Sequence, residues 1–256
     1  MKVIILSAGQ GRRLLPYTEN CPKCALQLGE RSALEWQLKA LHAGGANEVV
    51  VVAGFQAPQV RAIAAACTDL PVRVSHNPFY ALSDNLGTCW VARHEMHVPF
   101  VVVNGDTMFE AGIFRRLLAA PSKYPITLVT NVKSGYDADD MKVIVDGDRL
   151  VRVDKRLDVN AVSGESIGMI RFSDIGAALF RRQLESMMEN ESTLKRWYLS
   201  AIDELAAQGY VGTVSTGGLG WCEIDDPKDL AHAARVVPGW WRETAELPEP
   251  LAVTAG

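Results

Sequence analysis

A continuous apolar run at the start of the chain and four runs that resemble it, separated by segments with helical periodicity, constrain the fold more than any other feature. The runs are "MKVIILS" (1–7), "EVVVVAG" (48–54), "PVRVSHN" (71–77), "PFVVVNGD" (99–106) and "PITLVTNV" (125–132). Apolar runs of this kind are typical of parallel strands that are buried on both faces. Together with the helical segments between them, they predict an α/β fold: an open, mixed but mostly parallel sheet with helices on both faces.

Capping signals set the helix boundaries expected in the first half. Ser32 opens "SALEWQLKALHAGG" with a Ser-x-x-Glu capping box, and two glycines end this helix. The segments 59–70 ("QVRAIAAACTDL") and 83–96 ("SDNLGTCWVARHEM") predict two more helices, the second of them capped by Ser83.

The pattern changes after about residue 133. The segment 141–155 predicts a hairpin with its turn at Asp146-Gly147-Asp148. Further along we expect a strand, helices over 174–190 and 192–209, a strand over 210–216 and a final helix from Pro227. With no repeat and no linker, we expect a single domain over 1–237. The tail, 238–256, carries two tryptophans and predicts a surface strap or an interface, which leaves a monomer or a homodimer open.

Charge and composition exclude several classes of partner. The formal net charge is −4, so electrostatics give no reason to expect a nucleic acid or an anionic membrane as partner. No apolar run approaches the length of a membrane span. An odd count of five cysteines and no secretory signal predict reduced thiols and a cytoplasmic location.

A glycine-containing loop, "LSAGQGRRLLPYTENCPK" (6–23), follows the first strand directly. Open α/β sheets bind ligands outside the carboxyl ends of their strands. Gly9 and Gly11 let backbone amides approach a phosphate, and Arg12, Arg13 and Lys23 bring three cations to it. The loop matches neither a Walker A sequence nor G-x-G-x-x-G. The alternative to a phosphate site is a tight turn with solvated arginines.

Lys23 lies between two cysteines in "CPKC", a spacing that also occurs in zinc and redox sites. A structural zinc site needs two more ligands, and no second pair of cysteines or histidines has a compatible spacing. A thioredoxin-like motif starts a helix after a strand, whereas this one lies within the loop. We interpret Cys21 and Cys24 as packing residues around a functional lysine.

The loop also resembles a family signature. Ala8-Gly9-x-Gly11-x-Arg13-Leu14, followed by Pro22-Lys23-x-x-Leu26, is similar to the signature of nucleotidyltransferases that act on sugar phosphates and related small phosphates. Later blocks resemble bacterial phosphocholine cytidylyltransferases, in the same order: "NPFYALSDNLGTCWVA", "VVVNGDTMF", "MKVIVDGDRLVRVDK", "GESIGMIRFS" and "WCEIDDPKDL".

This resemblance implies a Rossmann-like nucleotidyltransferase fold of the GT-A-like type. A nucleotide-binding half would span 1–132 and an acceptor-binding half 133–237. The implied activity is Mg²⁺-dependent transfer of CMP from CTP to a small phosphorylated or phosphonate acceptor, such as phosphocholine or aminoethylphosphonate, with release of pyrophosphate. Both reactants are anions, so the chemistry needs neutralisation and alignment rather than a general base.

The resemblance also assigns roles to individual residues. Lys23, Arg13 and Asp106 are the implied catalytic residues, and Asp106 and Asp225 the implied Mg²⁺ ligands. Asp226 is the alternative ligand, although Asp226-Pro227 is also typical of a helix N-terminus. The residues implied in nucleotide binding are Ser7, Ala8, Gly9, Gly11, Arg12, Arg13, Lys23, Ser83, Asp84, Asn85, Gly105 and Asp106. Those implied in acceptor binding are Lys142, Lys155, Glu165, Trp197 and Tyr198.

Two further points concern specificity. Relatives tend to have two asparagines where this chain has Asp84-Asn85, which leaves the choice of base open. Trp197-Tyr198, with Asp139 and Asp140, predict an aromatic, acidic pocket for an ammonium group, although aromatic residues at helical spacing are more often core residues.

Three other functions compete with this interpretation. The first is a nucleotidylyltransferase for sugar 1-phosphates that uses UTP, GTP or dTTP. The second is a non-catalytic nucleotide-binding regulatory homologue, which we expect to have lost the lysine or a metal carboxylate. The third, a glycosyltransferase of similar fold, needs a D-x-D motif, which "NGDTM" does not provide.

Overall fold

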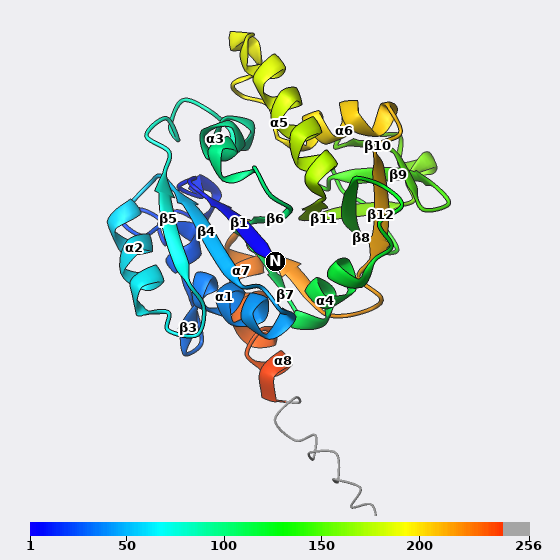
Figure 1. Ribbon diagram of the computed structural model, residues 1–256. Coiled ribbons are helices and arrows are strands. Elements are labelled where there is room, and N and C mark those ends of the chain that lie inside the picture. Colours follow the sequence, from blue (N-terminus) through cyan, green and yellow to red (C-terminus); the bar gives the residue numbers. More distant parts are fainter. Residues whose placement is uncertain (243–256) are drawn as a thin grey trace, which may run out of the picture.

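One continuous nine-stranded sheet forms the centre of the computed structural model, which describes residues 1–242 (Figure 1). The strands are β1 (Lys2–Ser7), β2 (Gln27–Leu28), β3 (Arg31–Ser32), β4 (Glu48–Ala53), β5 (Val72–His76), β6 (Phe100–Asn104), β7 (Thr107–Phe109), β8 (Ile126–Asn131), β9 (Lys142–Asp146), β10 (Arg149–Asp154), β11 (Gly164–Phe172), β12 (Val211–Ser215) and β13 (Trp221–Glu223). The helices are α1 (Ala33–Gly44), α2 (Ala57–Ala66), α3 (Asn85–Val91), α4 (Ala111–Ala119), α5 (Asp174–Met188), α6 (Leu199–Ala207), α7 (Pro227–Val236) and α8 (Gly239–Arg242).

The order of the sheet confirms the predicted α/β class. The strands lie in the order β5-β4-β1-β6-β11-β8-β12-β10-β9. β5, β4, β1 and β6 are parallel, and β8 and β12 are parallel to each other. β11 runs antiparallel between β6 and β8, and β9 and β10 form the predicted hairpin. β11 therefore separates β6 from β8, so the boundary near residue 132 does not divide the sheet into two blocks.

Helices cover both faces of the sheet, as the apolar runs predict. On β1, Ile4 and Leu6 pack in one cluster with residues of α3, α5 and α6. Val3 and Ile5 point to the opposite face and pack with residues of α1, α2 and α4. Figure 1 shows the two layers on opposite sides of the strands. Burial of alternate side chains on both faces explains why β1 is a continuous apolar run.

Two predicted helix features are wrong. Asp84, not Ser83, is the N-cap of α3, and its carboxylate accepts a hydrogen bond from the backbone N–H of Asn85 at 2.7 Å. The helix expected over 192–209 is interrupted: a 3₁₀ turn at Glu191–Thr193 is followed by irregular chain up to α6. The irregular stretch makes hydrogen bonds to the start of α3 that compete with helical ones.

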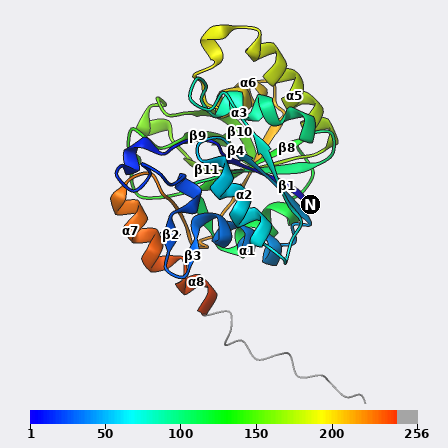
Figure 2. The same cartoon turned by 90° about the vertical axis from the view of Figure 1, so that its left-hand side faces the viewer.

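The end of the described chain packs on its own domain. α7 and α8 lie beside β2 and β3 in Figure 2, and the Trp241 ring stacks on Trp36 of α1 with 6.3 Å between ring centroids. The start of the predicted tail is thus an intramolecular strap, while residues 243–256 lie outside the described residues. Within residues 1–242, no helix is long and apolar enough to cross a membrane.

Candidate active site

The glycine loop leaves the carboxyl end of β1 and turns sharply at Gly11. Gly11 has a φ of +73°, a left-handed conformation that glycine adopts without strain. A Cβ at this position would lie 3.2 Å from Cβ of Lys23, so the glycine also leaves room for the lysine to pass. The Thr18 hydroxyl donates to the Gly11 carbonyl at 2.8 Å and fixes the loop. The loop thereby directs Lys23 back toward the ends of the strands.

Gly105 brings the end of β6 against the end of β1. Its backbone N–H donates to the carbonyl of Leu6 at 3.0 Å. A Cβ on Gly105 would lie 2.6 Å from that carbonyl oxygen and 2.2 Å from Oγ of Ser7, distances that no side chain tolerates. This close approach places Asp106 at the carboxyl ends of two neighbouring strands.

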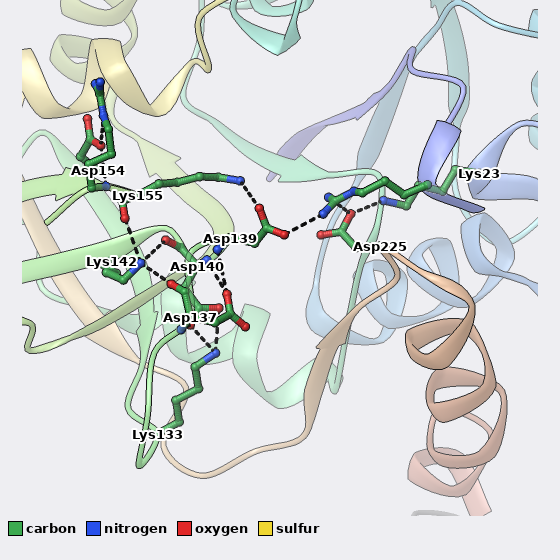
Figure 3. Close-up of polar contacts among 11 residues, drawn as sticks. Lys23, Lys133, Asp137, Asp139, Asp140, Lys142, Asp154, Lys155 and Asp225 are labelled. Carbon is green, nitrogen blue, oxygen red and sulfur yellow. Dashed lines mark hydrogen bonds and ion pairs between the residues drawn. The ribbon is translucent and has the colours of Figure 1, made fainter. Parts of the chain in front are cut away.

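Lys23, Asp106 and Asp225 meet although they are far apart in the sequence. Nζ of Lys23 lies 2.7 Å from Oδ2 of Asp106 and 2.8 Å from Oδ1 of Asp225. Arg13 reaches the same oxygen of Asp225 with Nη2 at 2.9 Å. The structure therefore brings together the three predicted catalytic residues and both predicted metal ligands. Figure 3 shows Lys23 and Asp225 at one end of a longer line of ion pairs.

The charges in this cluster stabilise one another. Burial alone would lower the pKa of Lys23, but the neighbouring Asp106 and Asp225 outweigh this effect and raise it. Burial would likewise raise the pKa of Asp225, whereas Lys23 and Arg13 lower it on balance. Lys23 is thus a cation and Asp225 an anion at neutral pH, as charge neutralisation at a phosphate and metal coordination require.

The structure separates Asp225 from Asp226. The Asp226 side chain accepts hydrogen bonds from the backbone N–H groups of Lys228 at 2.6 Å and Asp229 at 3.0 Å, which makes it the N-cap of α7. Asp225 faces Lys23 instead. Capping therefore accounts for Asp226 and leaves Asp225 available for metal.

We predict that Asp226→Ala lowers the free energy of unfolding by about 1 kcal/mol, the usual cost of losing an N-cap. Thermal or urea unfolding measures this change. Because Asp226 does not face Lys23, kcat should stay within about twofold of the wild-type value. A large loss of kcat with unchanged stability would instead identify Asp226 as the metal ligand.

The carboxylates of Asp106 and Asp225 fit a magnesium ion whose other ligands are phosphate oxygens and water. Oδ1 of Asp106 and Oδ1 of Asn104 are buried and make no hydrogen bond among the described residues. Glu223 lies close by, and burial together with the charges of Asp106 and Asp225 raises its pKa to about 8. No group of three or more His, Cys, Asp or Glu residues within 1–242 is arranged to hold a metal alone. Mg²⁺ typically takes one or two protein carboxylates and completes its shell with phosphate oxygens and water.

Two cavities adjoin the glycine loop. The larger, about 440 Å³, holds many of the residues predicted to bind the nucleotide, and we call it the nucleotide cavity for that reason. Its lining residues are Leu6, Ala8, Gly9, Gln10, Arg12, Tyr80, Ala81, Leu82, Ser83, Asp84, Asn85, Thr88 and Lys195. The smaller, about 200 Å³, continues from it to Lys23 and Asp106 and includes Ser7, Gly11 and Gly105 in its lining. All of the predicted nucleotide-binding residues except Arg13 thus line two adjoining cavities, which lie over the carboxyl ends of β1 and β6. Arg13 lines a third cavity instead.

A third cavity of about 320 Å³ lies between Arg13 and the second half of the chain. We call it the acceptor cavity, because Lys155, Glu165, Trp197 and Tyr198 of the predicted acceptor site line it. Asp139 bridges its two sides, with Oδ2 at 3.0 Å from Nη1 of Arg13 and Oδ1 at 3.6 Å from Nζ of Lys155 (Figure 3). Lys155 also lies over Trp197, with Nζ 4.7 Å from the ring centroid. Tyr198 is fully buried in the core, so only Trp197 offers an exposed ring to a ligand.

Lys142 and Glu165 have contacts that the sequence does not predict. The Lys142 ammonium donates to the backbone carbonyls of Asp137, Asp140 and Lys155 and is 2 % exposed, so it holds the loop and is not free for the predicted contact with a phosphate. Glu165 is ion-paired with Lys133, whose Nζ lies 2.8 Å from both Glu165 and Asp140.

Three charged side chains of the site were not predicted: Lys133, Lys195 and Glu223. Lys133 directly follows the apolar run that forms β8, the same kind of position that singles out Asp106. Glu223 lies two residues before Asp225, and side chains at that spacing in an extended chain point the same way. Nothing in the sequence marks Lys195, because a helix was expected there.

Comparisons with known proteins agree with this geometry. The family model for the MobA-like NTP transferase domain matches residues 3–196. Choline-phosphate cytidylyltransferase from Streptococcus pneumoniae is 29% identical over 126 residues, which are 49% of this chain and 53% of that protein. CMP-5'-(3-aminopropyl)phosphonate synthase from Streptomyces rubellomurinus is 28% identical over 248 residues, 91% of this chain and 38% of that protein.

Solved structures show the same fold. The inositol-1-phosphate CTP transferase from T. maritima superposes with a TM-score of 0.78 at 19% identity, covering 93% of this chain and 95% of that one. The matches span about half of the length of the curated relatives, or less. The resemblance inferred from the glycine loop is confirmed, because the family model covers most of the chain: this protein belongs to the family of MobA-like NTP transferases.

Proposed function

We propose that this protein transfers CMP from CTP to a small phosphorylated or phosphonate acceptor and releases pyrophosphate. The observation that carries the proposal is the meeting of Lys23, Asp106 and Asp225 within 2.8 Å at the ends of the strands, next to the nucleotide cavity. Relatives named for choline phosphate, aminopropylphosphonate and inositol 1-phosphate support the cytidylyl donor and the class of acceptor.

The residues of the site suit an in-line attack by an acceptor oxygen on the α-phosphorus of CTP. Lys23, whose charged side chain is only 15 % exposed, is the cation for the α-phosphate, where negative charge builds as pyrophosphate leaves. Arg13 would hold the β- and γ-phosphates, for which a guanidinium is well suited. The acceptor oxygen is already ionised, so these groups act by neutralisation and alignment.

A magnesium ion fits the carboxylates of Asp106 and Asp225, and the buried, unbonded oxygen of Asp106 supports this assignment. When bound, the ion neutralises charge on the triphosphate and helps to align it. Lys23 pairs with both carboxylates when they carry no metal. The same lysine can then turn from the carboxylates toward a phosphate.

For the acceptor, the site favours a molecule that carries both a phosphate or phosphonate and an ammonium group. Lys155 is the cation for the acid group, and Trp197, Asp139 and Asp140 are the partners for the ammonium. Carboxylates beside an exposed aromatic ring stabilise an ammonium group, which glucose 1-phosphate lacks.

A panel of donors and acceptors tests the proposal. CTP, UTP, GTP and dTTP are each incubated with phosphocholine, 2-aminoethylphosphonate, glycerol 3-phosphate and glucose 1-phosphate in the presence of Mg²⁺, and pyrophosphate release is followed. We expect turnover with CTP and one of the two amine-containing acceptors. Turnover only with glucose 1-phosphate and UTP, GTP or dTTP would instead show a sugar nucleotidylyltransferase.

A further inference from the structure

The irregular segment from Leu194 to Tyr198 lies between the nucleotide cavity and the acceptor cavity. Lys195 lines the nucleotide cavity, although it belongs to the second half of the chain. Trp197, two residues further on, lines the acceptor cavity together with Tyr198. A single short segment therefore presents side chains to both cavities.

Hydrogen bonds tie this segment to the start of α3, which lines the nucleotide cavity. The three bonds are Asp84 N–H to Leu194 O (2.8 Å), Leu86 N–H to Arg196 O (3.3 Å) and Tyr198 N–H to Asn85 Oδ1 (2.7 Å). Asn85 lines all three cavities of the site. Because its side-chain oxygen is occupied by Tyr198, its amide nitrogen is left to donate into them. Direct hydrogen bonds therefore link a segment that lines the nucleotide cavity to one that lines the acceptor cavity.

Lys195 has a free charge at the nucleotide cavity. Among residues 1–242, no carboxylate pairs with it, whereas Lys23, Arg13 and Lys133 are each engaged by two acidic groups. A nucleoside triphosphate is strongly anionic. A cation without an internal partner attracts such a ligand and does not have to break an ion pair first. Its favourable free energy of binding is therefore not reduced by the loss of an internal ion pair.

We propose that Lys195 is a nucleotide-binding residue supplied by the acceptor half, and that its segment couples nucleotide binding to the acceptor cavity. A nucleotide held by Lys195 fixes the segment in place, and Trp197 with it. The acceptor cavity then reaches its binding geometry when the nucleotide is present. This inference takes from the proposed function only that the donor is a nucleoside triphosphate.

CTP affinity tests the first half of the inference. Isothermal titration with CTP and Mg²⁺, without acceptor, compares the wild type with Lys195→Ala and Lys195→Arg. We expect a Kd about tenfold higher for Lys195→Ala, as for the loss of a hydrogen bond to a charged group, and near the wild-type value for Lys195→Arg. The affinity of Lys195→Ala should also fall less steeply with added salt.

A matched control is Arg182→Ala, which removes an exposed basic side chain on α5 that makes no ion pair within the described part of the chain. Its Kd for CTP should not change. Equal CTP affinities for the wild type and Lys195→Ala would overturn the inference and leave the proposed function intact. Failure of the folded wild type to bind CTP would instead overturn the proposed donor.

Tryptophan fluorescence tests the coupling. The change in tryptophan fluorescence on CTP binding is recorded for the wild type and for Trp197→Phe. The difference between the two changes is the contribution of Trp197. In the wild type, we expect Trp197 to contribute a clear part of the fluorescence change. The same contribution without Lys195 is obtained by comparing Lys195→Ala with Lys195→Ala/Trp197→Phe, both saturated with CTP. We expect it to be lost in that comparison. A Trp197 contribution to the fluorescence change that is equally large with and without Lys195 would overturn the coupling.

Discussion

Replacing Lys23 with alanine is expected to lower kcat by about 10²–10³-fold, the range seen when one group that stabilises transition-state charge is removed. The Lys23 side chain is 15 % exposed and its ammonium contacts both Asp106 and Asp225, so we expect neither solvent nor a neighbouring lysine to replace it. Steady-state pyrophosphate release with the best acceptor from the panel measures the effect.

Lys23→Arg is the control for this prediction. It keeps the positive charge but replaces a compact ammonium with a broader, planar group, so we expect partial activity between the wild type and Lys23→Ala. Circular dichroism and thermal unfolding show whether each variant is folded. Folded Lys23→Ala protein with kcat within about twofold of the wild type would contradict the role of Lys23.

Replacing either Asp106 or Asp225 with asparagine is expected to reduce kcat/KM by about 10²-fold or more and to raise the Mg²⁺ concentration needed for half-maximal activity. Asparagine keeps the shape of the side chain but removes the negative charge that a magnesium ion prefers in its ligands. EDTA should abolish wild-type activity, and added Mg²⁺ should restore it. A titration of activity against Mg²⁺ measures the shift.

The neighbouring Asp226→Ala is the matched control, because this carboxylate caps α7 and does not face Lys23. It should show the wild-type Mg²⁺ dependence at temperatures where it is folded. An Asp225→Asn variant whose Mg²⁺ dependence is also unchanged would show that Asp106 acts with another group, of which Glu223 is the nearest carboxylate candidate.

The strands and the class of fold were predictable because each buried strand leaves a clear pattern, a run of apolar residues, within a short stretch of sequence. β1, β4 and β6 are buried on both faces, and a strand in that environment has to be a continuous apolar run. The capping box of α1 and the turn of the β9–β10 hairpin are also local, and both are confirmed.

The antiparallel insertion of β11 between β6 and β8 was not predictable in this way. Pairing partners are chosen by contacts between distant parts of the chain, and "SIGMIRFS" contains no sign of its neighbours. The segment around Lys195 shows the same limit. Its sequence favours a helix, and hydrogen bonds from α3, more than 100 residues away, interrupt it.

At the site, the sequence predicted which residues lie close together better than it predicted the contacts of each one. Lys23 and Asp106 stand out because they lie in a loop after a strand and at the end of a strand, and the structure brings them together. Lys142 was implied in acceptor binding, yet its ammonium donates to three backbone carbonyls of its own half. Whether backbone carbonyls provide the hydrogen bonds of a buried ammonium depends on the geometry of the surrounding loop, which no short motif encodes.

The most direct test of the central claim follows the α-phosphorus of CTP. CTP labelled at the α-phosphate is incubated with Mg²⁺ and the acceptor selected by the panel, and the products are separated. The account predicts that the label appears in a CMP-linked acceptor in equal amount to the pyrophosphate released, and that Lys23→Ala makes almost none. Label that appears only in free CMP, or in CDP alongside inorganic phosphate, would contradict nucleotidyl transfer at this site.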